Sequence, residues 1–89
     1  MGLHVVVRGR VQGVGFRWFV RETARRLGAD GWVKNRPDGT VEVAASGDDE
    51  SLVMLRAALL RGPPGASVAS VDDVEASGES LPHPFTILK

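Results

Sequence analysis

The stretch that decides the fold runs from Gly9 to Arg17 and has the sequence GRVQGVGFR. An apolar strand pattern precedes it and an amphipathic helix pattern follows it, so it forms the turn between the first strand and the first helix. Positions 9, 13 and 15 of this turn are glycines. Glycine enters left-handed backbone conformations at low cost, which lets successive backbone N–H groups point into one concavity. Such a concavity suits an oxyanion.

The helix after this turn is expected to begin near Phe16 without a side-chain cap. The residues before it, Gln12 to Gly15, include no Ser, Thr, Asp or Asn to accept hydrogen bonds from the first-turn N–H groups. One interpretation is that an external anion caps the helix and Arg17 closes over it as a two-pronged cationic clamp. The other is that the glycines only form a tight turn and Arg17 is a surface arginine. Spacing alone leaves both open.

Composition is that of one globular domain, residues 1–89, with 43% hydrophobic and 25% charged side chains. The sequence contains no cysteine, which excludes disulfides, thiolate nucleophiles and cysteine-ligated zinc and fits a reducing compartment. The apolar runs are too short and broken for a signal peptide or a membrane span. We therefore expect a cytoplasmic protein with no membrane partner. We also expect a monomer.

Charge is unevenly distributed although the formal net charge is zero. Residues 1–36 contain eight arginines and lysines and two acidic residues, so the remainder of the chain is acidic. A basic half around the glycine turn raises the local concentration of a small anion. Domains that bind nucleic acid normally carry a net positive charge, so the neutral total argues against a nucleic-acid partner.

Hydrophobic periodicity predicts the elements of the first half of the chain. Alternation predicts a strand over residues 3–9, and apolar positions at helical spacing predict a helix over 16–27. Gly28 is a natural stop for that helix. Strands at 31–35 and 40–46, joined by the turn R-P-D-G, then form a hairpin.

The second half begins with Asp48, which is expected to cap a helix that extends to about Leu60. Valines spaced by three over residues 68–74 predict a strand with a bulge. A loop at 77–84 and a possible short closing strand at 85–88 complete the chain. This order predicts an α+β fold, a ferredoxin-like βαββαβ sandwich with an antiparallel sheet and both helices on one face.

With these elements placed, two motifs resemble the acylphosphatase family over nearly the whole chain. GRVQGVGFR matches that family's phosphate-loop signature, which ends in arginine. GWVKNRPDGTVEV, residues 31–43, matches its G-aromatic-x-K-N-x-x-x-G-x-V pattern. The resemblance implies hydrolysis of acyl phosphates, the mixed anhydrides of a carboxylic acid and phosphate, to carboxylate and orthophosphate without metal or cofactor. The C-terminal third gives little positive match.

Carried over by position, the resemblance assigns water orientation to Asn35 and phosphate binding to the loop and Arg17. The expected phosphate-binding residues are Val11, Gln12, Gly13, Val14, Gly15, Phe16 and Arg17. Inorganic phosphate or sulfate is expected at the same place. No metal site is expected, since Asp72 and Asp73 are neighbours on a strand and point to opposite faces.

Physical chemistry makes this assignment reasonable. A carboxylate is a good leaving group, and a loose phosphoryl-transfer transition state rewards alignment and charge stabilisation, so no catalytic histidine is required. His4 and His83 are accordingly not expected to be catalytic. Trp18 and Trp32 are interpreted as packing or site-rim residues. From local sequence alone, Asn35 before a P-D-G turn is a turn former.

Two other functions compete with the hydrolase. Ferredoxin-like RNA-binding modules stack bases on aromatic residues of the central strands, and residues 40–46 (TVEVAAS) contain none. An anion-binding regulatory or accessory domain is the second, since acylphosphatase-like domains occur inside larger maturation enzymes. Turnover by the isolated chain separates an enzyme from a sensor.

Overall fold

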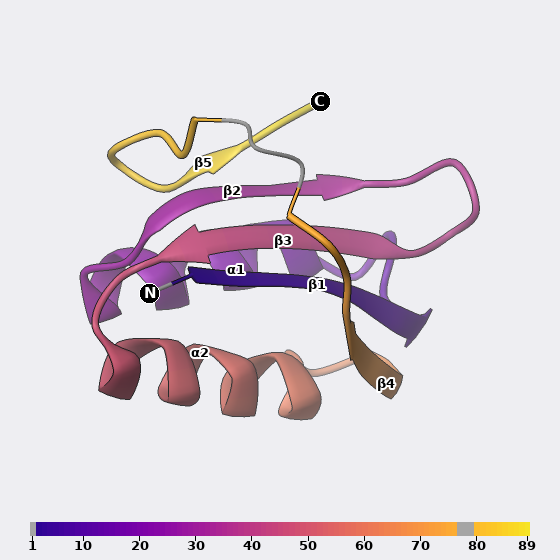
Figure 1. The fold of residues 1–89 in the computed structure, drawn as a ribbon. Helices are drawn as coiled ribbons and strands as arrows, with labels where there is room; N and C mark the ends of the chain where they lie inside the picture. Colours follow the sequence, from indigo (N-terminus) through magenta and orange to yellow (C-terminus); the bar gives the residue numbers. More distant parts are fainter. Residues whose placement is uncertain (1, 77–79) are drawn as a thin grey trace.

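The computed structural model describes residues 2–76 and 80–89, and it has the expected α+β architecture. Along the chain the elements are β1 (Gly2–Arg10), α1 (Phe16–Leu27), β2 (Asp30–Asn35), β3 (Val41–Ser46), α2 (Asp49–Arg61), β4 (Ser67–Asp73) and β5 (Thr86–Ile87). The strands form one sheet in the order β4-β1-β3-β2-β5, and both helices cover the same face (Figure 1). The predicted ferredoxin-like βαββαβ sandwich is confirmed. The loop expected at 77–84 lies partly outside the described residues.

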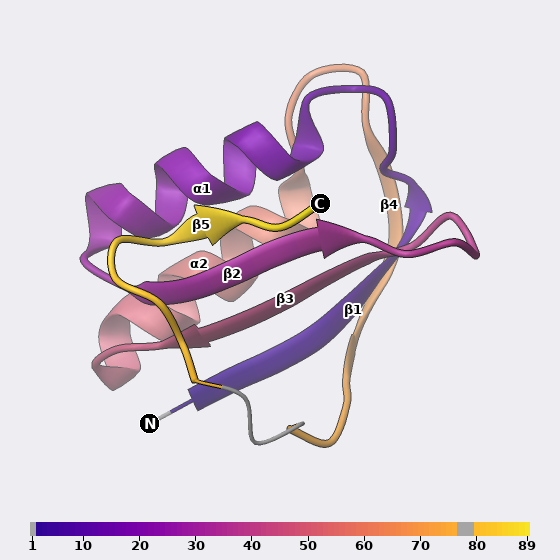
Figure 2. The same ribbon diagram turned by 90° about the horizontal axis from the view of Figure 1, so that it is seen from above.

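The direction of β5 differs from the all-antiparallel sheet that the sequence predicted. β1–β3, β1–β4 and β2–β3 pair antiparallel, whereas β5 runs parallel to β2, with Trp32 opposite Thr86 and Val33 opposite Ile87. β4 and β5 lie at opposite edges of the sheet, and β5 starts at the end where β2 starts (Figure 2). A hydrogen bond of 2.9 Å from the backbone N–H of Leu88 to the carbonyl oxygen of Val33 extends this pairing. The sheet is therefore mixed.

The hydrophobic core fills the space between the sheet and the two helices. Side chains alternate along the strands, so every second residue faces the helices. The largest fully buried members of this core are Phe16, Phe85, Leu55, Leu59, Val5, Val7, Val11, Val20, Val33 and Val41. Leu52, Leu55 and Leu59 of α2 and Val41, Val43 and Ala45 of β3 are all buried. Because α1 packs against this core, the position of its first turn relative to the sheet is fixed.

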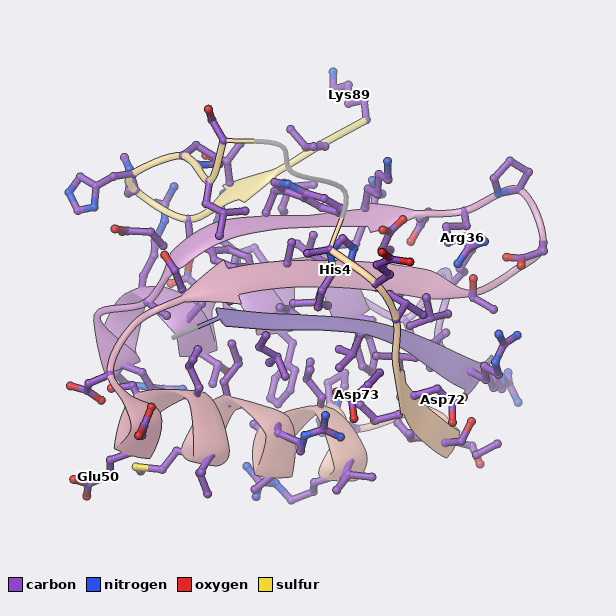
Figure 3. The ribbon with its side chains drawn as sticks, viewed as in Figure 1. His4, Arg36, Glu50, Asp72, Asp73 and Lys89 are labelled. Atoms are coloured by element: carbon purple, nitrogen blue, oxygen red, sulfur yellow. The ribbon has the colours of Figure 1, made fainter. Side chains whose placement is uncertain are left out.

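The sheet face away from the helices is partly covered rather than open. Trp32 is 1% exposed there, although strand alternation turns it away from the core residue Val33. The rings of His4 and Trp32 meet edge to face with centroids 5.6 Å apart, and Nε2 of His4 lies 2.5 Å from Oε2 of Glu42. Figure 3 shows His4 on this side of the sheet. Trp32 therefore packs on this face, in agreement with its interpretation as a packing residue, and His4 contacts it there.

The predicted bulge lies where β4 pairs with the end of β1. Arg8 is opposite Ser70 and Gly9 is opposite Val68, so one extra residue of β4 interrupts the register. Gly9 has φ 126°, and a Cβ there would approach the carbonyl oxygen of Ser67 to 2.2 Å. Only glycine fits this position. The bulge marks the point at which β1 gives way to the loop that leads into α1.

Candidate active site

The first turn of α1 has no cap from the chain's own side chains. Gly15 is the N-cap residue, with φ 74° and ψ 21°, and it makes no side-chain cap hydrogen bond; no acidic residue lies in the first turn. The second helix differs, because Oδ1 of Asp48 accepts a hydrogen bond of 2.8 Å from the N–H of Ser51. The expectation of an uncapped start is confirmed. A helix N-terminus of this kind offers free N–H groups and a favourable dipole to an anion.

The glycines of the loop are required by backbone conformation rather than by crowding. Gly13 and Gly15 both have positive φ, 77° and 74°, which is costly for any residue with a Cβ. A Cβ built at either position would meet no atom within 4 Å. The left-handed conformations of Gly13 and Gly15 therefore determine the course of the loop backbone, and the space beside these two glycines is open.

Asn35 brings a polar side chain to the same place from the sheet. It is the last residue of β2, and alternation puts it on the same face as Val33, the side that carries the helices. Its Oδ1 is buried and has no hydrogen-bond partner within the described residues. A buried acceptor without a partner costs roughly 1–3 kcal/mol. An oxygen in this state is explained when a bound molecule supplies the missing hydrogen bond.

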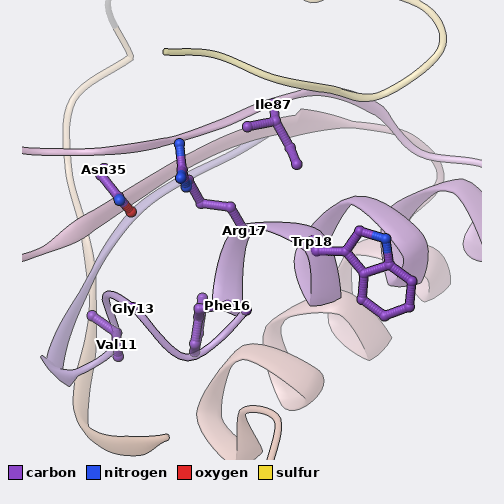
Figure 4. Close-up of a pocket in the computed structure, with 8 residues that line it drawn as sticks. Val11, Gly13, Phe16, Arg17, Trp18, Asn35 and Ile87 are labelled. Atoms are coloured by element: carbon purple, nitrogen blue, oxygen red, sulfur yellow. The ribbon is translucent and has the colours of Figure 1, made fainter.

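Arg17, Asn35 and the loop line one pocket, with a volume of about 190 Å³. Its lining residues are Val11, Gly13, Gly15, Phe16, Arg17, Trp18, Asn35 and Ile87. Figure 4 shows the guanidinium group of Arg17 extending toward the Asn35 side of the pocket. The structure thus brings together seven of these residues from positions 11–35, and β5 adds the eighth. Five of the expected phosphate-binding residues and the expected water-orienting residue meet here.

Gln12 and Val14 belong to the predicted loop but do not line the pocket. Nε2 of Gln12 donates hydrogen bonds to the carbonyl oxygens of Arg36, at 2.8 Å, and Thr40, at 2.9 Å. Val14 is partly buried and packs against the core. The side chain of Gln12 therefore joins the loop to the hairpin turn that follows Asn35.

The hairpin turn is ordered by its own hydrogen bonds. The backbone N–H and Oγ1 of Thr40 donate to Oδ1 of Asp38 at 3.0 and 2.6 Å, and these bonds lower the pKa of the Asp38 carboxyl below its ordinary value. The N–H of Arg36 donates to the carbonyl oxygen of Thr40 at 2.8 Å. A carboxylate that stays ionised keeps this turn, and with it the end of β2, in one conformation.

Two arginines of the basic first part of the chain form ion pairs. Nε of Arg8 lies 3.1 Å from Oδ2 of Asp72, and Nε of Arg21 lies 3.1 Å from Oε2 of Glu22. Within the described residues, Arg17 forms no ion pair and donates no hydrogen bond to the chain. The guanidinium of the pocket is thus available to an external anion. The described residues hold no cluster of three His, Asp or Glu side chains suited to a metal ion.

Trp18 and Ile87 were not predicted as functional residues, yet both line the pocket. Trp18 is 58% exposed at the mouth, in agreement with its interpretation as a rim residue. Ile87 comes from β5, which the sequence predicted as a closing strand without a link to the site. Its place beside Val33 follows from parallel pairing with β2, and no pattern in a two-residue strand predicts that pairing. Among the described residues, no helix is long and apolar enough to cross a membrane.

By its fold and its pocket, the protein is a small α+β sandwich with a cleft at a helix N-terminus that suits an anion. A family model described as acylphosphatase matches residues 3–87. The chain is 53% identical over 77 residues to the acylphosphatase of Thiobacillus denitrificans, a match that covers 86% of each protein. The chain therefore belongs to the acylphosphatase family, and its enzyme class is that of the acylphosphatases.

Solved structures agree with this assignment. The acylphosphatase of Bacillus subtilis superposes with a TM-score of 0.90 at 39% identity, and the match covers 99% of this chain and 98% of that one. Thermococcus kodakarensis HypF superposes with a TM-score of 0.85 at 30% identity, but the match covers 100% of this chain and only 12% of that protein. The same fold therefore also occurs as a small part of a much longer protein.

Proposed function

We propose that this chain hydrolyses the carboxyl–phosphate bond of acyl phosphates, with release of carboxylate and orthophosphate. One observation carries the proposal: among the described residues, Arg17 without an ion pair and the buried Oδ1 of Asn35 without a hydrogen-bond partner line one pocket at the uncapped start of α1. The relatives named acylphosphatases, 53% and 39% identical to this chain, support the reaction class. The substrate is a small molecule, and inorganic phosphate or sulfate competes for the same pocket.

In this proposal the phosphate half binds the loop from Val11 to Phe16. Backbone N–H groups at the start of α1 donate to the phosphate oxygens, and Arg17 adds a charge-assisted, two-pronged contact. Negative charge spreads over the equatorial oxygens in the transition state, so these donors stabilise it more than the ground state. The left-handed turns at Gly13 and Gly15 hold the donors in place before substrate arrives.

Asn35 orients the attacking water. Its Oδ1 accepts a hydrogen bond from the water and so fixes the direction of the water's lone pair toward phosphorus. A carboxamide is uncharged at neutral pH and is not a strong base, so we assign the water's proton to a phosphate oxygen of the substrate. The carboxylate leaves without protonation, which removes the need for a general acid. Alignment and charge stabilisation together supply the catalysis.

An RNA-binding function has little support in the structure. Trp32, the aromatic residue of the strand next to β3, is 1% exposed and packs against His4. β3 itself has no aromatic residue. A base therefore finds no stacking platform on these strands.

In the accessory-domain alternative, the pocket binds an anion as a sensor and does not turn it over. The observation that favours this alternative is the likeness of the chain to a small part of Thermococcus kodakarensis HypF.

The test is phosphate release by the purified chain from acetyl phosphate and from benzoyl phosphate, in buffer with EDTA. We expect turnover with both substrates, unaffected by the chelator. An Arg17→Ala preparation made in parallel excludes a contaminating phosphatase, since the variant is expected to be inactive. No turnover by the wild-type chain would leave the anion-sensor alternative, and loss of turnover with EDTA would contradict a metal-free reaction.

A further inference from the structure

The outward side of α2 is apolar, whereas that of α1 is charged. Three apolar residues of α2 are more than half exposed: Val53 at 68%, Met54 at 52% and Leu60 at 53%. Apart from Trp18, the side chains of α1 that face away from the core are Arg21, Glu22, Arg25 and Arg26. Charged side chains are typical of a helix whose outer side faces water. Apolar residues gathered on the outer side of a surface helix indicate an interaction site instead.

The exposed residues of α2 form a single stripe with a charge at each end. Residues three, four and seven apart share one face of a helix, so Glu50 and Arg61 lie on the face that carries the apolar residues. Figure 3 shows Glu50 at the start of α2, pointing away from the sheet. Both charged residues are exposed, and neither forms an ion pair with any described residue. We define the outer stripe of α2 as Glu50, Val53, Met54, Ala57, Leu60 and Arg61.

The outer stripe is complementary to itself when two copies meet antiparallel. In a pair with two-fold symmetry, every contact between two residues occurs twice. Glu50 of each copy then lies opposite Arg61 of the other. The same register places Met54 of one copy opposite Ala57 of the other, so a large and a small side chain meet near the axis. A parallel arrangement would instead bring like charges together, which is unfavourable.

We propose that the outer stripe of α2 is the contact surface of a weak, symmetric dimer of this chain. Hollows of about 280 and 370 Å³ flank the stripe, one lined by Met54 and the other by Val53, and can receive side chains of the second copy. In Figure 1 no described element lies beyond α2 on the side away from the sheet.

The size of this surface limits the strength of the dimer. One pair of helices buries less than the roughly 1,200 Å² of a stable interface, so we expect a dissociation constant of roughly 10–100 μM. The monomer expected from the sequence is then the species in dilute solution. The pocket at the start of α1 has no lining residue from α2, so the dimer is independent of the proposed function.

The first experiment is sedimentation equilibrium of the full chain between roughly 5 and 500 μM, a range that brackets the expected dissociation constant. Leu60→Glu puts a charge into the apolar part of the stripe and should raise the dissociation constant at least about tenfold. Its urea midpoint at low concentration should stay near that of wild type, because Leu60 is exposed. A wild-type chain that remains monomeric over the whole range, or a Leu60→Glu chain that dimerises like wild type, would overturn the proposal.

Val74→Glu is the matched control, because it adds the same charge at an exposed apolar residue outside the stripe. Its neighbour Asp73 pairs with Arg56 of α2, so strand alternation turns Val74 away from α2. The dissociation constant of Val74→Glu should equal that of wild type. An equal loss of dimer in Val74→Glu and Leu60→Glu would contradict a contact through α2.

Charge reversal tests the antiparallel arrangement. Glu50→Arg and Arg61→Glu each place like charges opposite one another, and symmetry doubles the effect, so each should raise the dissociation constant roughly three- to tenfold. The variant with both changes restores opposite charges and should return to within about threefold of wild type. Improved folding does not explain such a recovery, because both reversals oppose the dipole of α2. Additive weakening in the double variant would refute the dimer.

Discussion

Nε2 of Gln12 donates a hydrogen bond of 2.8 Å to the carbonyl oxygen of Arg36, the residue directly after Asn35. Its second hydrogen bond, of 2.9 Å, goes to the carbonyl oxygen of Thr40 on the other side of the hairpin turn. One side chain thus connects the loop proposed to hold phosphate with the strand end proposed to hold water. The relative position of the two depends on this link.

Replacement of Gln12 by Ala removes both hydrogen bonds and leaves two carbonyl oxygens without this donor. We expect kcat to fall roughly ten- to a hundredfold, because a small displacement of the water-holding residue disrupts alignment. The free energy of unfolding should fall by about 1–2 kcal/mol in urea titrations. Ser70→Ala, which removes an exposed hydrogen bond on β4, is the control and should keep full kcat. Wild-type kcat in Gln12→Ala would show that the link is dispensable.

Replacements of Arg17 and of Asn35 are expected to affect turnover and phosphate binding differently. Arg17→Ala should abolish measurable turnover, a loss of about 3 kcal/mol or more of transition-state stabilisation, and should weaken inhibition by inorganic phosphate. Asn35→Ala should lose turnover but largely keep phosphate inhibition, because it contacts the water and not the anion. Initial rates with acetyl phosphate and phosphate inhibition constants measure both effects. Equal loss of phosphate affinity in the two variants would refute the division of roles.

Gly15 and Gly28 cap opposite ends of α1 with almost the same backbone angles, φ 74° and ψ 21° against φ 76° and ψ 18°. A Cβ at either position meets no atom within 4 Å. Gly15→Ala and Gly28→Ala should therefore each cost about 1–2 kcal/mol of stability, through left-handed strain alone. Only Gly15→Ala should also weaken phosphate inhibition, because it alone lies in the pocket. Similar phosphate affinities in the two variants would argue against an anion at this helix start.

Asp48 gives the stability of α2 a pH dependence. The N–H of Ser51 donates to its carboxylate and lowers the pKa of Asp48 below the ordinary value of 3.8. Since the unfolded chain binds the proton more tightly, this stabilisation is complete well above pH 3.8 and is lost as the pH falls through the folded pKa. Asp48→Ala should thus have a lower urea midpoint than wild type at pH 7, with a gap that narrows in acid.

Asp48→Asn is the matched control for the cap, because asparagine keeps the accepting oxygen without a titrating proton. Its urea midpoint should be close to that of wild type at pH 7. Its stability should lack the contribution of the Asp48 carboxyl to the pH dependence in acid. A gap between wild type and Asp48→Ala that persists unchanged at pH 2 would contradict an ionised cap.

Much of the fold follows from local sequence signals. Helical spacing between Phe16 and Leu27, the stop at Gly28 and the cap at Asp48 all depend on residues close together in the chain, and each is confirmed. The antiparallel hairpin follows from alternation around the R-P-D-G turn. The direction of β5 does not follow, because a strand of two residues has no periodicity and its partner is more than fifty residues away.

The sequence predicted most residues of the candidate site, but it did not predict how they are arranged in space. The glycine pattern and the uncapped helix start indicated an anion loop. Recognition of Asn35 depended on family resemblance, since its local sequence is that of a turn former. The hydrogen bonds of Gln12 and the place of Ile87 in the pocket depend on contacts between distant segments, which no sequence pattern records.

Because β5 lies at an edge of the sheet, the pocket is lined by two separate parts of the sequence. The groups proposed for the chemistry lie between residues 11 and 35, in the loop before α1, its first turn and the end of β2, whereas Ile87 reaches the pocket from an outermost strand. Edge segments accept exchange more readily than central ones, because fewer neighbours depend on them. Grafting this segment from a relative would thus change one wall of the pocket and leave the residues proposed for the chemistry in place.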